Sequence, residues 1–248
     1  MQGTIAVDKQ AIEIEYDKLI FEPPEIGCVL YMPGLPGGGS KIYDRSPYAN
    51  IGTIVGPTWV RTPGGLWALS FDAAVDDYVS LASNLTKALT AVTALFWINP
   101  NDKSTTHSLI GDYTSTTDVS MVCQVIDVAA TTTWKLGFYT KGEDSAANSL
   151  LGTTTTLSYG KWYLWGATWN GARKVVYING VSDGIVERVD ASLESTVTLN
   201  TTIGAYQAAA NKENVYGIMA LTRVFNRALS ALEIQNHFNR EKYLFNVW

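Results

Sequence analysis

The sequence predicts an all-β protein of the sandwich type with one helix near its end. Three observations favour this class. From Gly27 onward, short strand-like runs alternate with turn residues for about two hundred residues, which is typical of sandwiches. Only 17% of the residues are charged, whereas 46% are hydrophobic, enough for a large core. A helical pattern is confined to residues 229–243.

Composition and charge exclude several classes of protein. The 248 residues carry a formal net charge of −5 and a pI near 5.0, which argues against a phosphate-binding nucleic-acid surface. No apolar run is long enough to cross a bilayer, and the N-terminal sequence lacks the pattern of a signal peptide. We therefore expect synthesis in a reducing compartment, with Cys28 and Cys123 as buried free thiols; a disulfide between them is the alternative.

The N-terminal residues 1–25 differ from the rest and are predicted to form an arm or edge strand, ahead of a domain spanning residues 26–248. Ile12, Ile14 and Tyr16 alternate with acidic residues, as in a half-buried strand, and the prolines of "EPPE" end the pattern. Such a strand needs a sheet edge. The edge belongs either to its own sandwich or, by β-augmentation, to a neighbouring subunit or a larger particle.

The strands that follow are predicted from runs rich in β-branched and aromatic residues between turn residues. In chain order these runs are GCVLYM (27–32), LWALSF (66–71), DYVSL (77–81), ALFWINP (94–100), HSLIGDY (107–113), VSMVCQVIDV (119–128), WKLGFYT (134–140) and TTIGAY (201–206). No internal repeat of fixed period stands out, which argues against a propeller or solenoid.

Residues 161–181 predict three antiparallel strands joined by two tight turns. Asn170-Gly171 and Asn179-Gly180 are pairs that tolerate positive φ at both central positions of a type I′ turn. Alternation places Trp162 and Leu164 on one face and Tyr163 and Trp165 on the other, so one of these sets fills the core between the sheets. We interpret most of the eight tryptophans as core residues.

The helix near the end is predicted by a capping box. Ser230 is followed three residues later by Glu233, a spacing that satisfies free N–H groups at a helix start. Ile234 and Phe238 then share one face. We expect residues 231–241 to be mainly helical.

Several motifs in a fixed order resemble one family. The motifs are a "YD.S…N.G" loop (Tyr43, Asp44, Ser46, Asn50, Gly52), the segment ALSFDAAVDDYV (68–79), the tryptophan-containing meander, a late "IG", and a closing segment from Gly217 to Ile234. Together, over roughly residues 26–240, they resemble the concanavalin A-like, laminin-G-like (LamG) domains. The resemblance implies a two-sheet antiparallel jelly-roll sandwich.

Members of this family often hold a structural calcium ion with a carboxylate from the closing strand. Ala220 and Leu221 stand at that place here, and Asp44 alone makes a poor calcium cage. We therefore expect no metal and no other cofactor.

The family also includes glucanases and lyases, so catalysis must be considered. The glucanase relatives carry Glu-x-Asp-x-x-Glu on one strand, and retaining glycosidases need two carboxylates about 5 Å apart. The nearest candidates, Glu15 to Glu22 and Glu187 to Glu194, do not keep this spacing. His107 and His237 have no neighbouring pattern that indicates a triad or a zinc site. We predict no catalytic residues.

Sugar recognition needs an aromatic surface and a few fixed polar groups at a concave face or loop rim. The residues predicted to supply them are Asn99, Asp102, Asp112, Tyr113, Trp134 and Tyr139.

The favoured function is a non-catalytic, lectin-like binding or decoration module that binds surface glycans. Because the fold suits an outside-facing role while no signal peptide is visible, we predict a virion surface protein of a phage capsid or tail. A homo-oligomer, or docking to a particle through the N-terminal arm, is expected, with no nucleic acid and no membrane insertion. The alternatives are a polysaccharide hydrolase or lyase of the same fold, and a purely structural assembly subunit.

Overall fold

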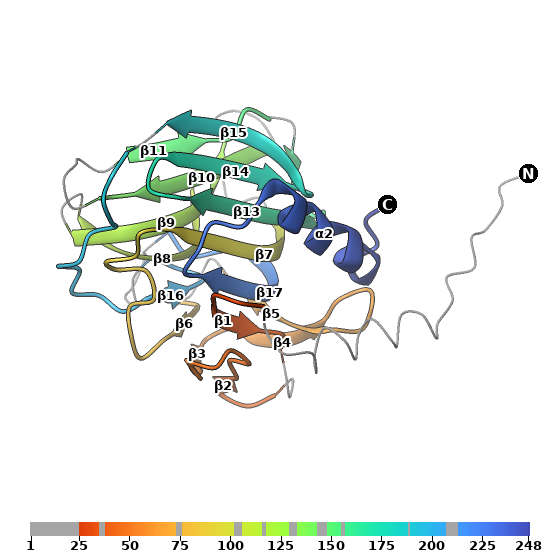
Figure 1. Ribbon diagram of the computed structural model, residues 1–248. Coiled ribbons are helices and arrows are strands. Elements are labelled where there is room, and N and C mark those ends of the chain that lie inside the picture. Colours follow the sequence, from red (N-terminus) through yellow and green to blue (C-terminus); the bar gives the residue numbers. More distant parts are fainter. Residues whose placement is uncertain are drawn as a thin grey trace, which may run out of the picture.

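The computed structural model describes residues 25–34, 38–72, 76–101, 106–115, 118–128, 133–142, 148–154, 157–187, 189–206 and 213–248. Strands make up most of this part of the chain, and they form two antiparallel sheets (Figure 1). The predicted sandwich is confirmed. The predicted N-terminal arm, except for Glu25, lies outside the described residues, as do Asp102 and the acidic candidates Glu15 to Glu22.

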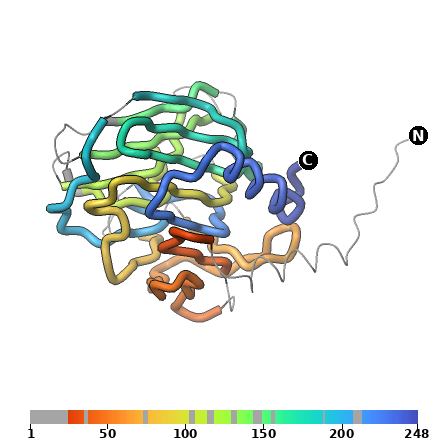
Figure 2. Tube along the Cα trace, viewed as in Figure 1, coloured from red at the N-terminus to blue at the C-terminus, as the bar shows by residue number. Residues whose placement is uncertain are grey.

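The first sheet has eight strands. Its order is β15 (Val181–Glu187), β14 (Arg173–Ile178), β13 (Tyr163–Trp169), β7 (Val92–Pro100), β17 (Gly217–Phe225), β5 (Trp67–Phe71) and β4 (Thr58–Arg61), and β1 (Cys28–Met32) also pairs with β17. The first described strand therefore lies beside the last strand of the chain, as Figure 2 shows.

The second sheet has nine strands. Its order is β11 (Asn148–Leu151), β10 (Thr133–Thr140), β9 (Asp118–Asp127), β8 (His107–Ser115), β16 (Thr202–Ile203), β6 (Tyr78–Ser80), β3 (Gly52–Val55) and β2 (Lys41–Ile42), and β12 (Leu157–Ser158) also pairs with β10. The short strand β16 joins β8 to β6, so residues far apart in sequence share this sheet.

The main core lies between the two sheets. Phe96 of β7 stacks on Trp165 of β13 with 4.9 Å between ring centroids, and Trp134 of β10 belongs to the same core from the nine-stranded sheet. Cys123 belongs to this core, and Cys28 is buried elsewhere. Both cysteines are free, as the sequence predicted.

A second core lies on the outer face of the eight-stranded sheet. Helix α2 (Ala231–Glu241) and the 3-10 helix η1 (Lys242–Phe245) cover this face, as Figure 1 shows. Trp97 of β7 stacks on Phe245 at 4.2 Å and on Phe238 at 5.9 Å between centroids. The predicted capping box is present: the Glu233 N–H donates to Ser230 Oγ, and the Ser230 N–H donates to the Glu233 carboxylate. No helix in the described chain is long and apolar enough to span a membrane.

Both predicted hairpins form, but they use different turn chemistry. Asn179 and Gly180 both have positive φ, 51° and 81°, as a type I′ turn requires. At the other turn only Gly171 has positive φ, 85°, so the expectation for this pair was wrong in detail. There Asn170 Oδ1 accepts hydrogen bonds from the N–H groups of Ala172 (3.1 Å) and Arg173 (2.8 Å). The Asn170 side chain therefore stabilises this turn.

Candidate functional site

The two sheets differ in what lies over their outer faces. The C-terminal helices cover the eight-stranded sheet, whereas side chains on the outer face of the nine-stranded sheet are partly exposed. Strand β10 shows the alternation: Trp134, Leu136 and Phe138 point into the core, so Lys135 and Tyr139 point outward. The outer face of β8, β9 and β10 therefore presents partly exposed side chains that a ligand can reach.

Three tyrosines form a cluster on this face, which we call the tyrosine cluster. Tyr113 of β8 lies edge-on to Tyr139 of β10, with 5.9 Å between centroids, and edge-on to Tyr206, with 5.1 Å. The Tyr113 N–H donates to the Tyr206 carbonyl at 2.9 Å, which joins β8 to the segment after β16. All three rings are partly exposed. Edge-to-face packing holds the rings while part of each stays available to a ligand.

The environment keeps the phenols of Tyr139 and Tyr206 protonated. Partial burial is the main cause of the raised pKa of Tyr139, and the nearby Tyr113 phenol adds to it. Partial burial is also the main cause of the raised pKa of Tyr206, and Glu213 and Tyr113 add smaller contributions. Both groups therefore remain hydrogen-bond donors at neutral and mildly alkaline pH.

A carboxylate is fixed beside the cluster. Glu213 Oε2 accepts hydrogen bonds from Ser108 Oγ (3.1 Å) and Gln124 Nε2 (3.2 Å), and the Glu213 carbonyl accepts one from the Ser108 N–H (2.6 Å). Ser108 and Gln124 are cross-strand partners on β8 and β9. Together with the tyrosines, these groups give the combination that sugar recognition needs: aromatic rings and a few fixed polar atoms.

The structure brings together two of the six residues that the sequence singled out, Tyr113 and Tyr139. Asp112 is fully buried, and its Oδ1 accepts hydrogen bonds from the N–H groups of Ser120 (2.8 Å) and Met121 (3.1 Å), so it fixes the start of β9. Burial raises the pKa of this carboxyl, although the hydrogen bonds oppose that effect. Its place beneath the surface makes it a support of the cluster rather than a ligand contact.

The remaining predicted residues lie elsewhere. Trp134 is fully buried in the main core, edge-on to Tyr163 at 5.2 Å, so no ligand can stack on its ring. Asn99 lies on β7 in the other sheet, opposite Ile218. Asp102 lies outside the described residues.

Sequence reasoning missed Tyr206, Gln124 and Glu213. Tyr206 ends the run "TTIGAY", and Gln124 lies within a predicted strand, so both could have been noted. Glu213 lies between β16 and β17 in a segment without periodicity. Its contact with Ser108, 105 residues earlier, is created only by the fold.

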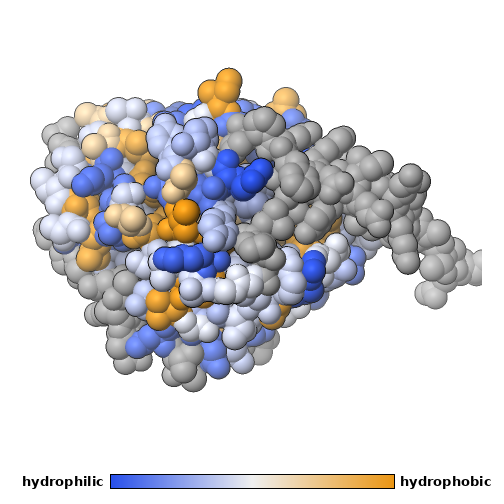
Figure 3. All heavy atoms as spheres, turned by 90° about the horizontal axis from the view of Figure 1, so that it is seen from below, coloured by the Kyte–Doolittle hydropathy of each residue, from blue (hydrophilic) through white to orange (hydrophobic). Residues whose placement is uncertain are grey.

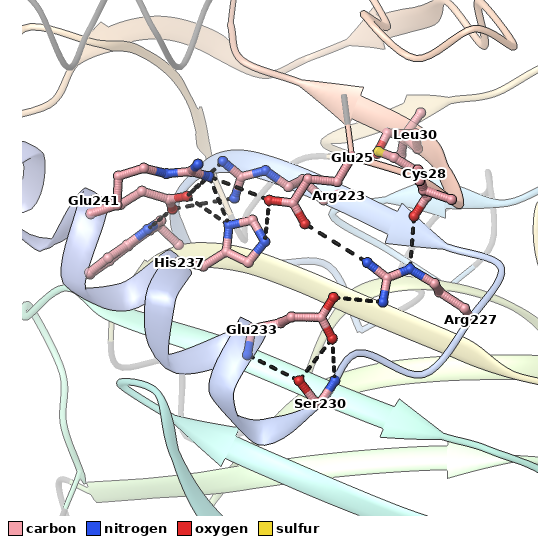
Figure 4. A network of polar contacts seen from close by, with 12 residues as sticks. Glu25, Cys28, Leu30, Arg223, Arg227, Ser230, Glu233, His237 and Glu241 are labelled. Carbon is pink, nitrogen blue, oxygen red and sulfur yellow. Dashed lines mark hydrogen bonds and ion pairs between the residues drawn. The ribbon is translucent and has the colours of Figure 1, made fainter. Parts of the chain in front are cut away.

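A second polar network lies beneath the C-terminal helix, and it is structural (Figure 4). The Glu241 carboxylate accepts hydrogen bonds from Trp97 Nε1 (2.8 Å) and Arg223 Nη2 (2.8 Å), and it lies 3.2 Å from His237 Nδ1. Burial alone raises the pKa of Glu241, but Arg223 and His237 hold it well below its usual range. Glu25 completes the network through His237 Nε2 at 3.3 Å.

Glu187 and Glu194, considered for catalysis, and Asp44, considered for calcium, have structural partners in the fold. Glu187 forms an exposed ion pair with Arg173 at 2.7 Å, and Glu194 pairs with Lys141. Asp44 accepts hydrogen bonds from the N–H groups of Tyr31 and Ser46, which shapes the loop before β3. Within the described residues, no group of three His, Cys, Asp or Glu side chains could hold a metal ion.

Comparison with known families agrees with this architecture. Residues 72–235 match the model of the concanavalin A-like lectin/glucanases superfamily. The chain belongs to this superfamily. A search of curated proteins gives no match.

Solved structures share the fold at low sequence identity. The binding domain of Paraclostridial Mosquitocidal Protein 1 aligns with a TM-score of 0.65 at 14% identity, covering 86% of this chain and 52% of that one. The binding domain of Botulinum Neurotoxin DC in complex with SialylT gives 0.62 at 16%, covering 88% and 52%. A heptameric SAP-like pentraxin from Limulus polyphemus gives 0.51 at 20%, covering 64% and 73%. The chain spans about half the length of the two toxin domains.

Proposed function

We propose that this superfamily member is a non-catalytic, lectin-like module that binds carbohydrate through the tyrosine cluster. The observation that carries the proposal is the arrangement of Tyr113, Tyr139 and Tyr206 beside Gln124 and Glu213, on the sheet face that the C-terminal helices leave uncovered. The similarity to binding domains of toxins and to a pentraxin supports a binding role.

The chemistry of the cluster suits a sugar ring. Carbon-bound hydrogens of a pyranose pack on aromatic faces, while its hydroxyls exchange hydrogen bonds with neighbouring polar groups. Raised pKa values keep the phenols of Tyr139 and Tyr206 as donors, and the Glu213 carboxylate is an acceptor. The backbone link between Tyr113 and Tyr206 arranges the rings in advance, which lowers the entropy cost of binding.

Binding of the unmodified protein and of two variants to a glycan array tests this site. Tyr113→Ala removes the central ring, and Tyr48→Ala removes a tyrosine that is 60% exposed and lies in the loop before β3. We expect Tyr113→Ala to weaken binding about tenfold or more, the equivalent of roughly 1.4 kcal/mol, and Tyr48→Ala to bind as the unmodified protein does. Equal binding by all three proteins would refute the site.

The proposal includes the absence of polysaccharide cleavage. The acidic candidates Glu187 and Glu194 are each held in an ion pair. Incubation with β-glucans and alginate should release neither reducing ends nor unsaturated products. Product release that stops when one carboxylate is changed to its amide would support the hydrolase or lyase alternative. A purely structural subunit would bind no glycan at all.

Display on a virion, and assembly through the arm of residues 1–25, stay predictions of the sequence. Deletion of residues 1–24 tests the arm. Docking to a second subunit or a particle predicts a folded domain with an unchanged melting temperature that no longer oligomerises or attaches. An arm that belongs to its own sandwich predicts early melting and unchanged assembly.

A further inference from the structure

The tyrosine cluster has a negatively charged group beside it, and this charge bears on which class of sugar the proposed site binds. Glu213 is the carboxylate at its edge: it accepts a hydrogen bond from Gln124, which lies two residues along β9 from Val122, the cross-strand partner of Tyr139. Its carboxylate oxygen accepts hydrogen bonds from the neutral groups Ser108 Oγ and Gln124 Nε2. Neutral donors fix the position of a carboxylate without cancelling its charge.

No cation neutralises Glu213 among the residues that the structure describes. The ion pairs found there join other partners, among them Arg173 with Glu187, Lys141 with Glu194, and Arg223 with Glu241. Lys135 lies on the outer face of β10, two residues from Gly137, the cross-strand partner of Gln124, but in the described part of the chain it forms no ion pair with Glu213. The net charge of −5 adds a repulsive background for polyanions.

We infer that this site selects uncharged saccharides and rejects acidic ones, with Glu213 as the residue that determines the specificity. The inference rests on the proposed carbohydrate function. A sugar hydroxyl can donate a charge-assisted hydrogen bond to Glu213, whereas a carboxylate or sulfate on the ligand meets a like charge. Glu213 therefore favours one class of ligand and disfavours the other.

The test uses pairs of saccharides that differ by one carboxylate, such as a galactose-terminated oligosaccharide and its galacturonic acid counterpart. Calorimetry gives the ratio of the two dissociation constants for each protein. We expect the acidic ligand to bind the unmodified protein about tenfold more weakly, and 0.5 M NaCl to reduce this ratio, because salt screens exposed charges.

Two variants with the same chemical change separate the local effect from the net charge. Glu213→Gln keeps an acceptor for Ser108 and Gln124 but removes the charge, so the ratio should fall to about threefold or less. Glu187→Gln removes one negative charge from the exposed pair with Arg173 in the other sheet, and the ratio should stay about tenfold.

Each outcome has a distinct meaning. Acidic ligands that bind the unmodified protein as well as neutral ones would overturn the inference, and so would an unchanged ratio in Glu213→Gln. If neutral ligands still lose affinity in Tyr113→Ala in that case, the proposed binding site stands. Failure of every glycan to bind, or full binding by Tyr113→Ala, would overturn the proposed function and the inference together.

Discussion

The outer faces of the two sheets use aromatic residues in opposite ways. On the eight-stranded sheet, Trp97 lies under Phe238 and Phe245 and is fully buried. On the nine-stranded sheet, Tyr113, Tyr139 and Tyr206 pack edge-on and remain partly exposed. The difference comes from the C-terminal helices, which turn one face into a second core and leave the other partly exposed.

The polar groups of the two faces differ in the same way. Beneath the helix, Arg223 and Glu241 are buried as an ion pair at 2.8 Å, with His237 beside them. On the other face, Glu213 has neutral partners and lies near the surface. Figure 3 views the molecule from below, a different side from these two faces, and there the hydrophobic residues of the described chain form only small groups among hydrophilic ones. The buried ion pair therefore belongs to the covered face, and the proposed recognition site belongs to the uncovered one.

The largest expected effect comes from breaking the buried ion pair. Arg223→Met leaves the Glu241 carboxylate buried without its main cation, which should destabilise the protein by about 3–5 kcal/mol. Arg173→Met breaks the exposed pair with Glu187 and should cost at most about 1 kcal/mol. Urea unfolding of both variants measures the difference; equal costs would mean that the helix is not held by this pair.

The two opposite faces of β10 offer a second comparison. Trp134→Ala empties a core position and should cost about 3–5 kcal/mol. Tyr139→Ala removes a partly exposed ring, so it should cost much less stability while weakening glycan binding about tenfold. Thermal melts and calorimetry on the same samples show whether the two functions separate. A large loss of stability in Tyr139→Ala would mean that this ring is structural.

The cap of helix α2 should contribute a smaller amount. Ser230→Ala removes the acceptor for the Glu233 N–H, at 3.2 Å, and should destabilise the protein by about 1 kcal/mol. Glycan binding should not change, because the helix lies over the other sheet. A change in affinity with unchanged stability would contradict the separation of the two faces.

The pH dependence of stability should show the smallest effect, and it belongs to the helix face. Burial lowers the pKa of His237, but hydrogen bonds with Glu241 and Glu25 outweigh it, so the net shift is upward from 6.5. The stabilisation that protonated His237 gives through Glu241 and Glu25 is therefore complete below about pH 6.5, and it is lost as the pH rises through the folded-state pKa of His237. The sequence has two histidines, so NMR titration can follow His237 directly, with Glu25→Gln expected to lower its pKa.

Local chemistry in the sequence determined the all-β class, both hairpins and the helix. Asn179-Gly180 forms its turn from the two residues themselves, and the Ser230–Glu233 capping box needs only the spacing of three. These features depend on neighbours in the chain, so the pattern predicts them without knowledge of packing. The resemblance to the family added the two-sheet jelly-roll architecture.

The tertiary structure alone decided which aromatic residues stay partly exposed. Alternation along β10 separates Trp134 from Tyr139, but both sets of residues could fill a core, so the pattern does not say which side is covered. Pairing of β8 with β9 shifts register between Gly111 and Tyr113, which periodicity cannot reveal. Glu213 reaches Ser108 only because β16 inserts beside β8. Contacts between distant segments are set by the free energy of the whole fold, and the tyrosine cluster with Glu213 is made of such contacts.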